Sequence, residues 1–86
     1  MLFHRAVTHL VLYSRPGCHL CDDMKALIEH VQRSMPLSLE VIDISTNAEL
    51  ETLYGLEIPV LVVDGKKVAK YRIAEHDLRR LLTSRG

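Results

Sequence analysis

The chain has 86 residues, of which 48% are hydrophobic, enough for one small domain with an efficient apolar core. Its 11 lysines and arginines balance 11 aspartates and glutamates, so we do not expect nucleic acid to be a main partner. No stretch approaches the roughly 20 apolar residues of a membrane-spanning helix. We therefore expect a single-domain, monomeric, cytoplasmic protein covering residues 1–86, with no membrane partner.

The first half of the chain predicts a strand, a long helix and a second strand. Residues 7–13 (VTHLVLY) are rich in β-branched and aromatic residues and precede Pro16-Gly17, which predicts a buried strand and a turn. Apolar residues then recur at steps of three and four over residues 18–33, the period of a helix. Residues 37–44 (LSLEVIDI) follow a proline and predict a second strand. Such a unit normally makes a parallel pair of strands.

A short second helix is predicted next. Thr46 and Glu49 match a capping box, in which the two side chains satisfy unpaired amides at a helix start. The pattern gives this helix a buried face of Leu50, Leu53 and Tyr54. Gly55 is placed where a left-handed residue often ends a helix.

The last third of the chain predicts a hairpin and a closing helix. Residues 58–63 (IPVLVV) read as a strand, and Asp64-Gly65 is a strong turn signal before a fourth strand over residues 66–71. An amphipathic pattern then marks the closing helix through Leu78, Leu81 and Leu82. The predicted class is α/β, with the order βαβαββα and helices on both faces of a four-stranded mixed sheet.

Two cysteines, Cys18 and Cys21, lie between the first predicted strand and helix. A disulfide between them closes too small a loop to be an effective structural cross-link. A C-x-x-C pair in a βαβ context favours a redox motif, because a helix N-terminus stabilises a thiolate. Helical periodicity places Cys18 opposite the apolar stripe and Cys21 on its flank. We therefore expect Cys18 to attack a substrate disulfide and Cys21 to resolve the mixed disulfide.

The neighbours of Cys18 have opposing effects on its thiol. Gly17 leaves its approach open, Arg15 adds positive potential, and a protonated His19 would stabilise the thiolate. Asp22 and Asp23 favour the helix but oppose a second anion nearby. These residues together predict a moderately lowered thiol pKa.

Other interpretations of the cysteine pair are open. Two buried cysteines can act simply as small hydrophobes. A zinc site requires four ligands, and no second cysteine pair is present. The five histidines are scattered along the chain: His4, His9, His19, His30 and His76. We expect no metal site and no tightly bound cofactor.

Three motifs carry a family resemblance: YSRPGCHLC at residues 13–21, IPV at residues 58–60 and the DG pair at residues 64–65. With them the chain resembles the glutaredoxin branch of the thioredoxin superfamily, and is similar to small bacterial glutaredoxin-like proteins. The resemblance implies the sheet order 2-1-3-4 and a cis Ile58–Pro59 bond facing the sulfurs. It also implies that the backbone of Ile58 and Val60 pairs with a bound peptide or glutathione.

The chain departs from this pattern where glutathione-binding glutaredoxins carry a glycine pair and an acidic residue. Here the bulky Tyr71 stands in that region, although Lys70 or Arg72 could meet a carboxylate of the ligand. Thioredoxins carry tryptophan in place of Gly17 and a buried acid in place of Leu12. These departures concern the electron donor more than the class of chemistry.

The expected function is thiol-disulfide oxidoreduction. The expected partners are a protein disulfide or glutathione mixed disulfide and a thiol reductant system, with glutathione a candidate electron donor. One alternative is a redox-idle binding module that uses the edge at Pro59. Another is a dimer that bridges an iron–sulfur cluster through Cys18, with glutathione supplying the remaining thiolates.

Overall fold

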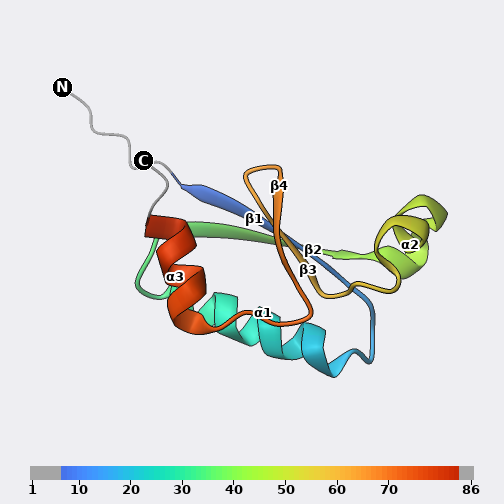
Figure 1. Cartoon of the computed structure of the whole chain (residues 1–86), viewed down its shortest axis with the longest axis horizontal. Coiled ribbons are helices and arrows are strands. Elements are labelled where there is room, and N and C mark those ends of the chain that lie inside the picture. The colour runs from blue at the N-terminus through green and yellow to red at the C-terminus, as the bar shows by residue number, and fades with distance from the viewer. Residues whose placement is uncertain (1–6, 84–86) are drawn as a thin grey trace.

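The computed structural model, which describes residues 7–83, forms a four-stranded mixed sheet with three α-helices (Figure 1). The elements in chain order are β1 (Thr8–Ser14), α1 (His19–Gln32), β2 (Leu37–Asp43), a 3-10 turn (Ile44–Thr46), α2 (Ala48–Tyr54), β3 (Val60–Val63), β4 (Lys66–Lys70) and α3 (Glu75–Thr83). The strand order is β2-β1-β3-β4, with β1 parallel to β2 and antiparallel to β3. The predicted α/β class and sheet order are confirmed.

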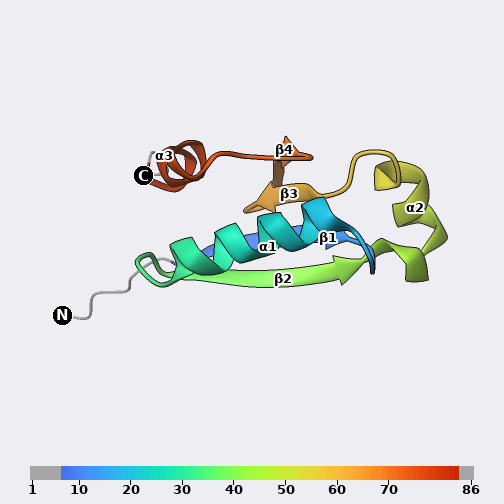
Figure 2. The same cartoon turned by 90° about the horizontal axis from the view of Figure 1, so that it is seen from below.

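One face of the sheet carries the main core, which α1 and α3 cover (Figures 1 and 2). This core joins residues from β1, α1, β2, β3 and α3: Leu10, Leu12, Met24, Ile28, Val31, Leu37, Leu61, Val63, Leu78 and Leu82. Each such side chain contributes about 1.5–3 kcal/mol when it is buried. The core therefore fixes α1, and with it the position of the dithiol at its start.

The helix α2 lies at the end of the sheet where β1 and β2 finish (Figure 2). Its contact with the other face of the sheet is a ring stack, in which Tyr54 lies 4.4 Å from Tyr13 between ring centroids. No residue of α2 is buried, so the predicted buried face of this helix is wrong: Leu50 and Tyr54 are half-buried and Leu53 is 62% exposed. The seven-residue helix lies beyond the main core, which explains this exposure.

The start of α2 also differs from the predicted capping box. Asn47 is the N-cap, and its Oδ1 accepts hydrogen bonds from the amides of Glu49 (2.9 Å) and Leu50 (3.1 Å). The hydroxyl of Thr46 instead donates to the carbonyl of Asp43, within the 3-10 turn. The preceding turn engages the threonine, so the adjacent asparagine caps the helix.

The end of α2 is a second correction. Gly55 has a right-handed conformation with φ −53°, whereas the sequence predicted a left-handed one. A Cβ atom at Gly55 would lie 2.5 Å from the carbonyl oxygen of Glu51. Glycine is required here by the close approach of the preceding turn rather than by its conformational freedom.

Both strands of the hairpin are shorter than predicted. β3 begins at Val60, so Ile58 and Pro59 lie in the loop before it, and the peptide bond between them is cis. β4 ends at Lys70, and Tyr71 follows with φ +68°. Among the helices within residues 7–83, none has the length and apolar character needed to cross a membrane.

Candidate functional site

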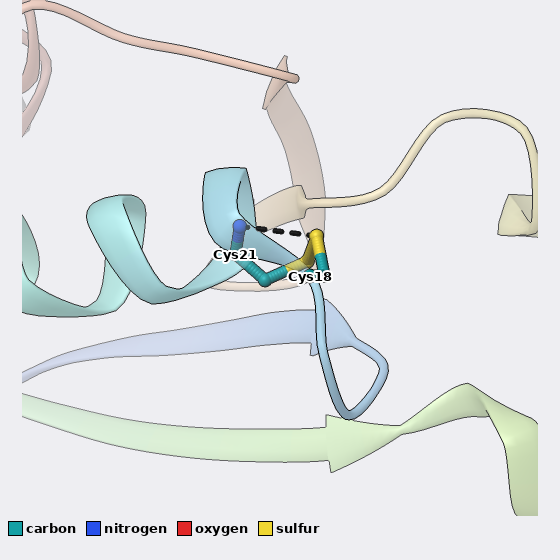
Figure 3. The surroundings of a disulfide bond; sticks show 2 residues. All are labelled: Cys18 and Cys21. Atoms are coloured by element: carbon teal, nitrogen blue, oxygen red, sulfur yellow. Dashed lines mark hydrogen bonds between the residues drawn. A yellow bond between two sulfur atoms is a disulfide. The ribbon is translucent and has the colours of Figure 1, made fainter.

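The two cysteines lie where β1 gives way to α1. Gly17, with φ +79°, makes the turn that precedes them, a conformation that glycine adopts at little cost. Cys18 is the N-cap of α1, and its Sγ accepts a hydrogen bond from the amide of Cys21 at 3.1 Å (Figure 3). The two sulfurs form a disulfide, with their Cα atoms 5.2 Å apart. The structure therefore holds the oxidised form of the pair.

The two sulfur environments differ in the direction that the helical periodicity predicts. Cys21 is 3% exposed and lies on the buried side of α1 with Met24 and Ile28. Cys18 is half-buried, at the open end of the helix. A substrate disulfide approaching from solvent can therefore meet Cys18 but not Cys21.

Arg15, expected to tune the thiolate, forms an ion pair with Glu51 of α2. Its Nε atom is buried and has no hydrogen-bond partner among residues 7–83. Hydrogen bonds from Ser45 lower the pKa of Asp43, and the charge of Arg15 lowers it further. The positive charge of Arg15 is thus shared between two carboxylates. Sequence reasoning missed Glu51, because 36 residues separate the partners.

The first turn of α1 carries the other charged groups considered from the sequence. His19, Asp22 and Asp23 are all exposed. Asp22 lies where a carboxylate complements the partial positive charge of the helix start. Solvent screens these three side chains from the sulfurs more than it would screen buried groups.

The loop before β3 reaches the same end of the sheet as the dithiol. Val60 pairs with Tyr13, which lies five positions before Cys18 in the chain. Val60 is fully buried and has strand neighbours on both sides, Tyr13 and Lys70. Ile58 lies outside the strand, and neither its amide nor its carbonyl has a main-chain hydrogen-bond partner within residues 7–83. Of the two residues predicted to pair with a ligand, Ile58 and Val60, Ile58 is therefore the one whose backbone amide and carbonyl are unpaired within the described residues.

Arg72 lies in the connection from β4 to α3. A cavity of about 360 Å³ separates this connection from α1, and Leu20, Met24, Tyr71 and Arg72 are among its lining residues. Leu20 stands between the two cysteines in the chain, so the structure brings Arg72 to a cavity beside the dithiol helix.

The side chains that could bind a metal ion are scattered in the part of the chain that the structure describes. There, no group of three or more histidine, cysteine, aspartate or glutamate side chains could hold an ion. His4 falls outside the described residues.

Comparison with known proteins extends these observations. The model of the glutaredoxin-like domain family (DUF836) matches residues 9–83. The Glutaredoxin-like protein YDR286C homolog of Dictyostelium discoideum is 33% identical over 72 residues, which cover 77% of this chain and 67% of that protein.

The chain is also similar to several solved structures. Protein Ne2328 from Nitrosomonas europaea is 32% identical, with a TM-score of 0.79 over 94% of this chain and 98% of that one. Protein XcR50 from X. campestris is 30% identical, with a TM-score of 0.75 over 90% and 99% of the two chains. A thioredoxin mutant from Halobacterium salinarum, 24% identical, shares the fold, with a TM-score of 0.67 over 90% and 73%. The chain belongs to the glutaredoxin-like domain family, within the thioredoxin superfamily.

Proposed function

We propose that the protein is a thiol-disulfide oxidoreductase in which Cys18 is the nucleophile and Cys21 the resolving thiol. The observation that carries the proposal is the asymmetry of the pair: Cys18 is half-buried at the helix start, and Cys21 is 3% exposed behind it. The amide of Cys21, 3.1 Å from the sulfur of Cys18, would stabilise a thiolate there in the reduced protein.

The reaction passes two electrons from the dithiol to the substrate. The Cys18 thiolate attacks one substrate sulfur, a Cys18–substrate disulfide forms, and the other substrate sulfur leaves as a thiolate that takes a proton from water. Cys21 then loses its proton and attacks the Cys18 sulfur. The substrate is released as a dithiol, and the Cys18–Cys21 disulfide remains. Leu12 offers no carboxylate to take the Cys21 proton, so we assign that step to water.

A thiol reductant must return the two electrons. We propose an open site for the substrate, formed by Cys18, Gly17, Pro59 and the free peptide group of Ile58, with Arg72 at the adjacent cavity. An assay that supplies electrons from glutathione with its reductase, or from thioredoxin reductase, identifies the reductant. We propose a reducing compartment as the place of action.

A trapping experiment tests the mechanism. Cys21→Ser should accumulate a mixed disulfide at Cys18 with a disulfide-containing protein such as insulin, detected by intact-mass spectrometry. The matched control, Cys18→Ser, should trap nothing, because the remaining thiol is buried. Equal trapping at both positions would contradict the assigned roles. A wild-type protein that never forms the Cys18–Cys21 disulfide across glutathione redox buffers would contradict the proposed function as a whole.

A further inference from the structure

Tyr71 contacts the loop before β3 at both ends. Its backbone amide donates to the carbonyl of Pro59 at 2.9 Å, and its hydroxyl donates to the carbonyl of Leu56 at 3.0 Å. The tyrosine side chain therefore runs alongside the loop that contains Ile58. We call these two hydrogen bonds the Tyr71 clamp.

The backbone of Tyr71 is itself unusual. Its φ of +68° lies in the left-handed region, which costs a residue with a side chain about 1–2 kcal/mol. A tight turn accompanies it, in which the amide of Arg72 donates to the carbonyl of Lys70 at 2.8 Å. Glycine would adopt this conformation without strain, so conformation alone does not account for a tyrosine here. Such an outlier indicates that the side chain has a role.

Further contacts from β4 hold the same loop. Glu57 forms an ion pair with Lys67, and the Nζ of Lys70 lies 3.8 Å from the other carboxylate oxygen of Glu57. The same Nζ lies 5.5 Å from the centre of the Tyr71 ring. These contacts engage both neighbours of Ile58 in the chain and leave the peptide group of Ile58 unpaired.

We infer that Tyr71 is a positioning residue that selects polypeptide disulfides as substrates, an inference that rests on the proposed function. The clamp fixes the loop so that the free peptide group of Ile58 can pair with an extended chain next to the reacting disulfide. A substrate with residues on either side of its disulfide gains from this pairing. A small disulfide without a peptide backbone does not.

The test compares two substrates under steady-state conditions, with dithiothreitol as the electron donor. Insulin supplies disulfides within polypeptide, and bis(2-hydroxyethyl) disulfide supplies one without. Tyr71→Phe removes the hydroxyl bond to Leu56, and the KM for insulin should rise roughly fivefold, as expected for one lost hydrogen bond. The kcat for insulin and both constants for the small disulfide should stay within about twofold of wild type.

Two further variants sharpen the test. Tyr71→Gly keeps the left-handed backbone and removes the whole side chain, so its KM for insulin should rise at least as much. Tyr54→Phe removes a hydroxyl from α2 and is the matched control, with kinetics like those of wild type. An unchanged KM for insulin in Tyr71→Phe, or equal changes for the two substrates, would overturn the inference.

A measurement without turnover separates the clamp from the chemistry. In ¹⁵N relaxation experiments, the amides of Glu57 and Ile58 should become more mobile in Tyr71→Phe than in wild type. Unchanged relaxation would overturn the clamp whether or not the protein is active. If the wild-type protein reduces neither disulfide but Tyr71→Phe still shows the relaxation change, the proposed function is overturned and the clamp stands.

Discussion

The guanidinium of Arg15 forms an ion pair with the carboxylate of Glu51 and thereby joins the loop before Cys18 to α2. Because the two side chains are 39% and 38% exposed, the pair should contribute less than about 1 kcal/mol to folding. A double-mutant cycle of Arg15→Met and Glu51→Gln, measured by urea unfolding, gives this coupling energy. A coupling above about 2 kcal/mol would mean that solvent screens the pair much less than its exposure indicates.

Removing the ion pair of Arg15 should also change the thiolate fraction of reduced Cys18. In Glu51→Gln the carboxylate that holds the guanidinium is gone, so more of the positive charge acts on Cys18. The thiolate fraction of reduced Cys18, followed by ultraviolet absorption, should therefore be higher at a given pH than in wild type. Arg15→Met should lower it. If neither substitution alters the titration, Arg15 serves only to hold α2.

The ring stack between Tyr13 and Tyr54 is the second contact that holds α2 to the end of β1. A stacked pair contributes about 0.5–1.5 kcal/mol beyond its buried area. Tyr54→Ala should therefore lower the free energy of unfolding by more than about 1 kcal/mol and speed hydrogen exchange in α2. Tyr54→Phe keeps the stack and should leave both quantities nearly unchanged. Wild-type exchange rates in Tyr54→Ala would show that α2 is held by other contacts.

Glu57 makes the loop before β3 sensitive to acid. The hydrogen bond from Lys67 lowers the pKa of Glu57 below its ordinary value of 4.5, and the charges of Lys67 and Lys70 add to this effect. A depressed carboxylate pKa means that the unfolded chain binds the proton more readily, so stability rises with pH in this range. The contribution is present above about pH 4.5 and is lost as the pH falls through the folded-state pKa.

Glu57→Gln should accordingly reduce the free energy of unfolding at pH 7. The difference from wild type should disappear when the pH falls well below 4.5, where the wild-type carboxyl is also neutral. Urea unfolding across this range measures the effect. Glu29→Gln, at an exposed position on α1, is the control. A difference that stays constant with pH would show that the substitution acts through packing rather than through charge.

Gly55 and Gly65 should respond to alanine for different reasons. At Gly55 the added Cβ would lie 2.5 Å from the carbonyl of Glu51, and relieving this overlap should cost about 1–3 kcal/mol. At Gly65 the space is open but φ is +84°, so Gly65→Ala should cost about 1–2 kcal/mol through backbone strain alone. Chemical unfolding gives both values. A neutral Gly55→Ala would show that the end of α2 can shift without cost.

Features that depend on local chemistry could be predicted from the order of the amino acids alone. The change from a period of two to a period near 3.6 marked β1 and α1, and the observed helix begins one residue after its predicted start. The turn at Asp64-Gly65 predicted the hairpin correctly. The same local signals placed Cys18 at the start of a helix, with Cys21 on its covered side. Neighbouring residues carry this information, so no knowledge of the packing was needed.

Contacts between residues far apart in the chain could not be predicted in this way, because they depend on how the elements pack. Arg15 pairs with a residue 36 positions away, and the hydroxyl of Tyr71 reaches a carbonyl 15 positions away. Asn47 caps α2 in place of the predicted Thr46, because the hydroxyl of Thr46 is hydrogen-bonded within the preceding 3-10 turn. Leu53 fits the apolar pattern predicted for α2 but is exposed, because α2 lies beyond the core. A sequence pattern specifies what a side chain can bury or bind, whereas packing determines whether a partner is within reach.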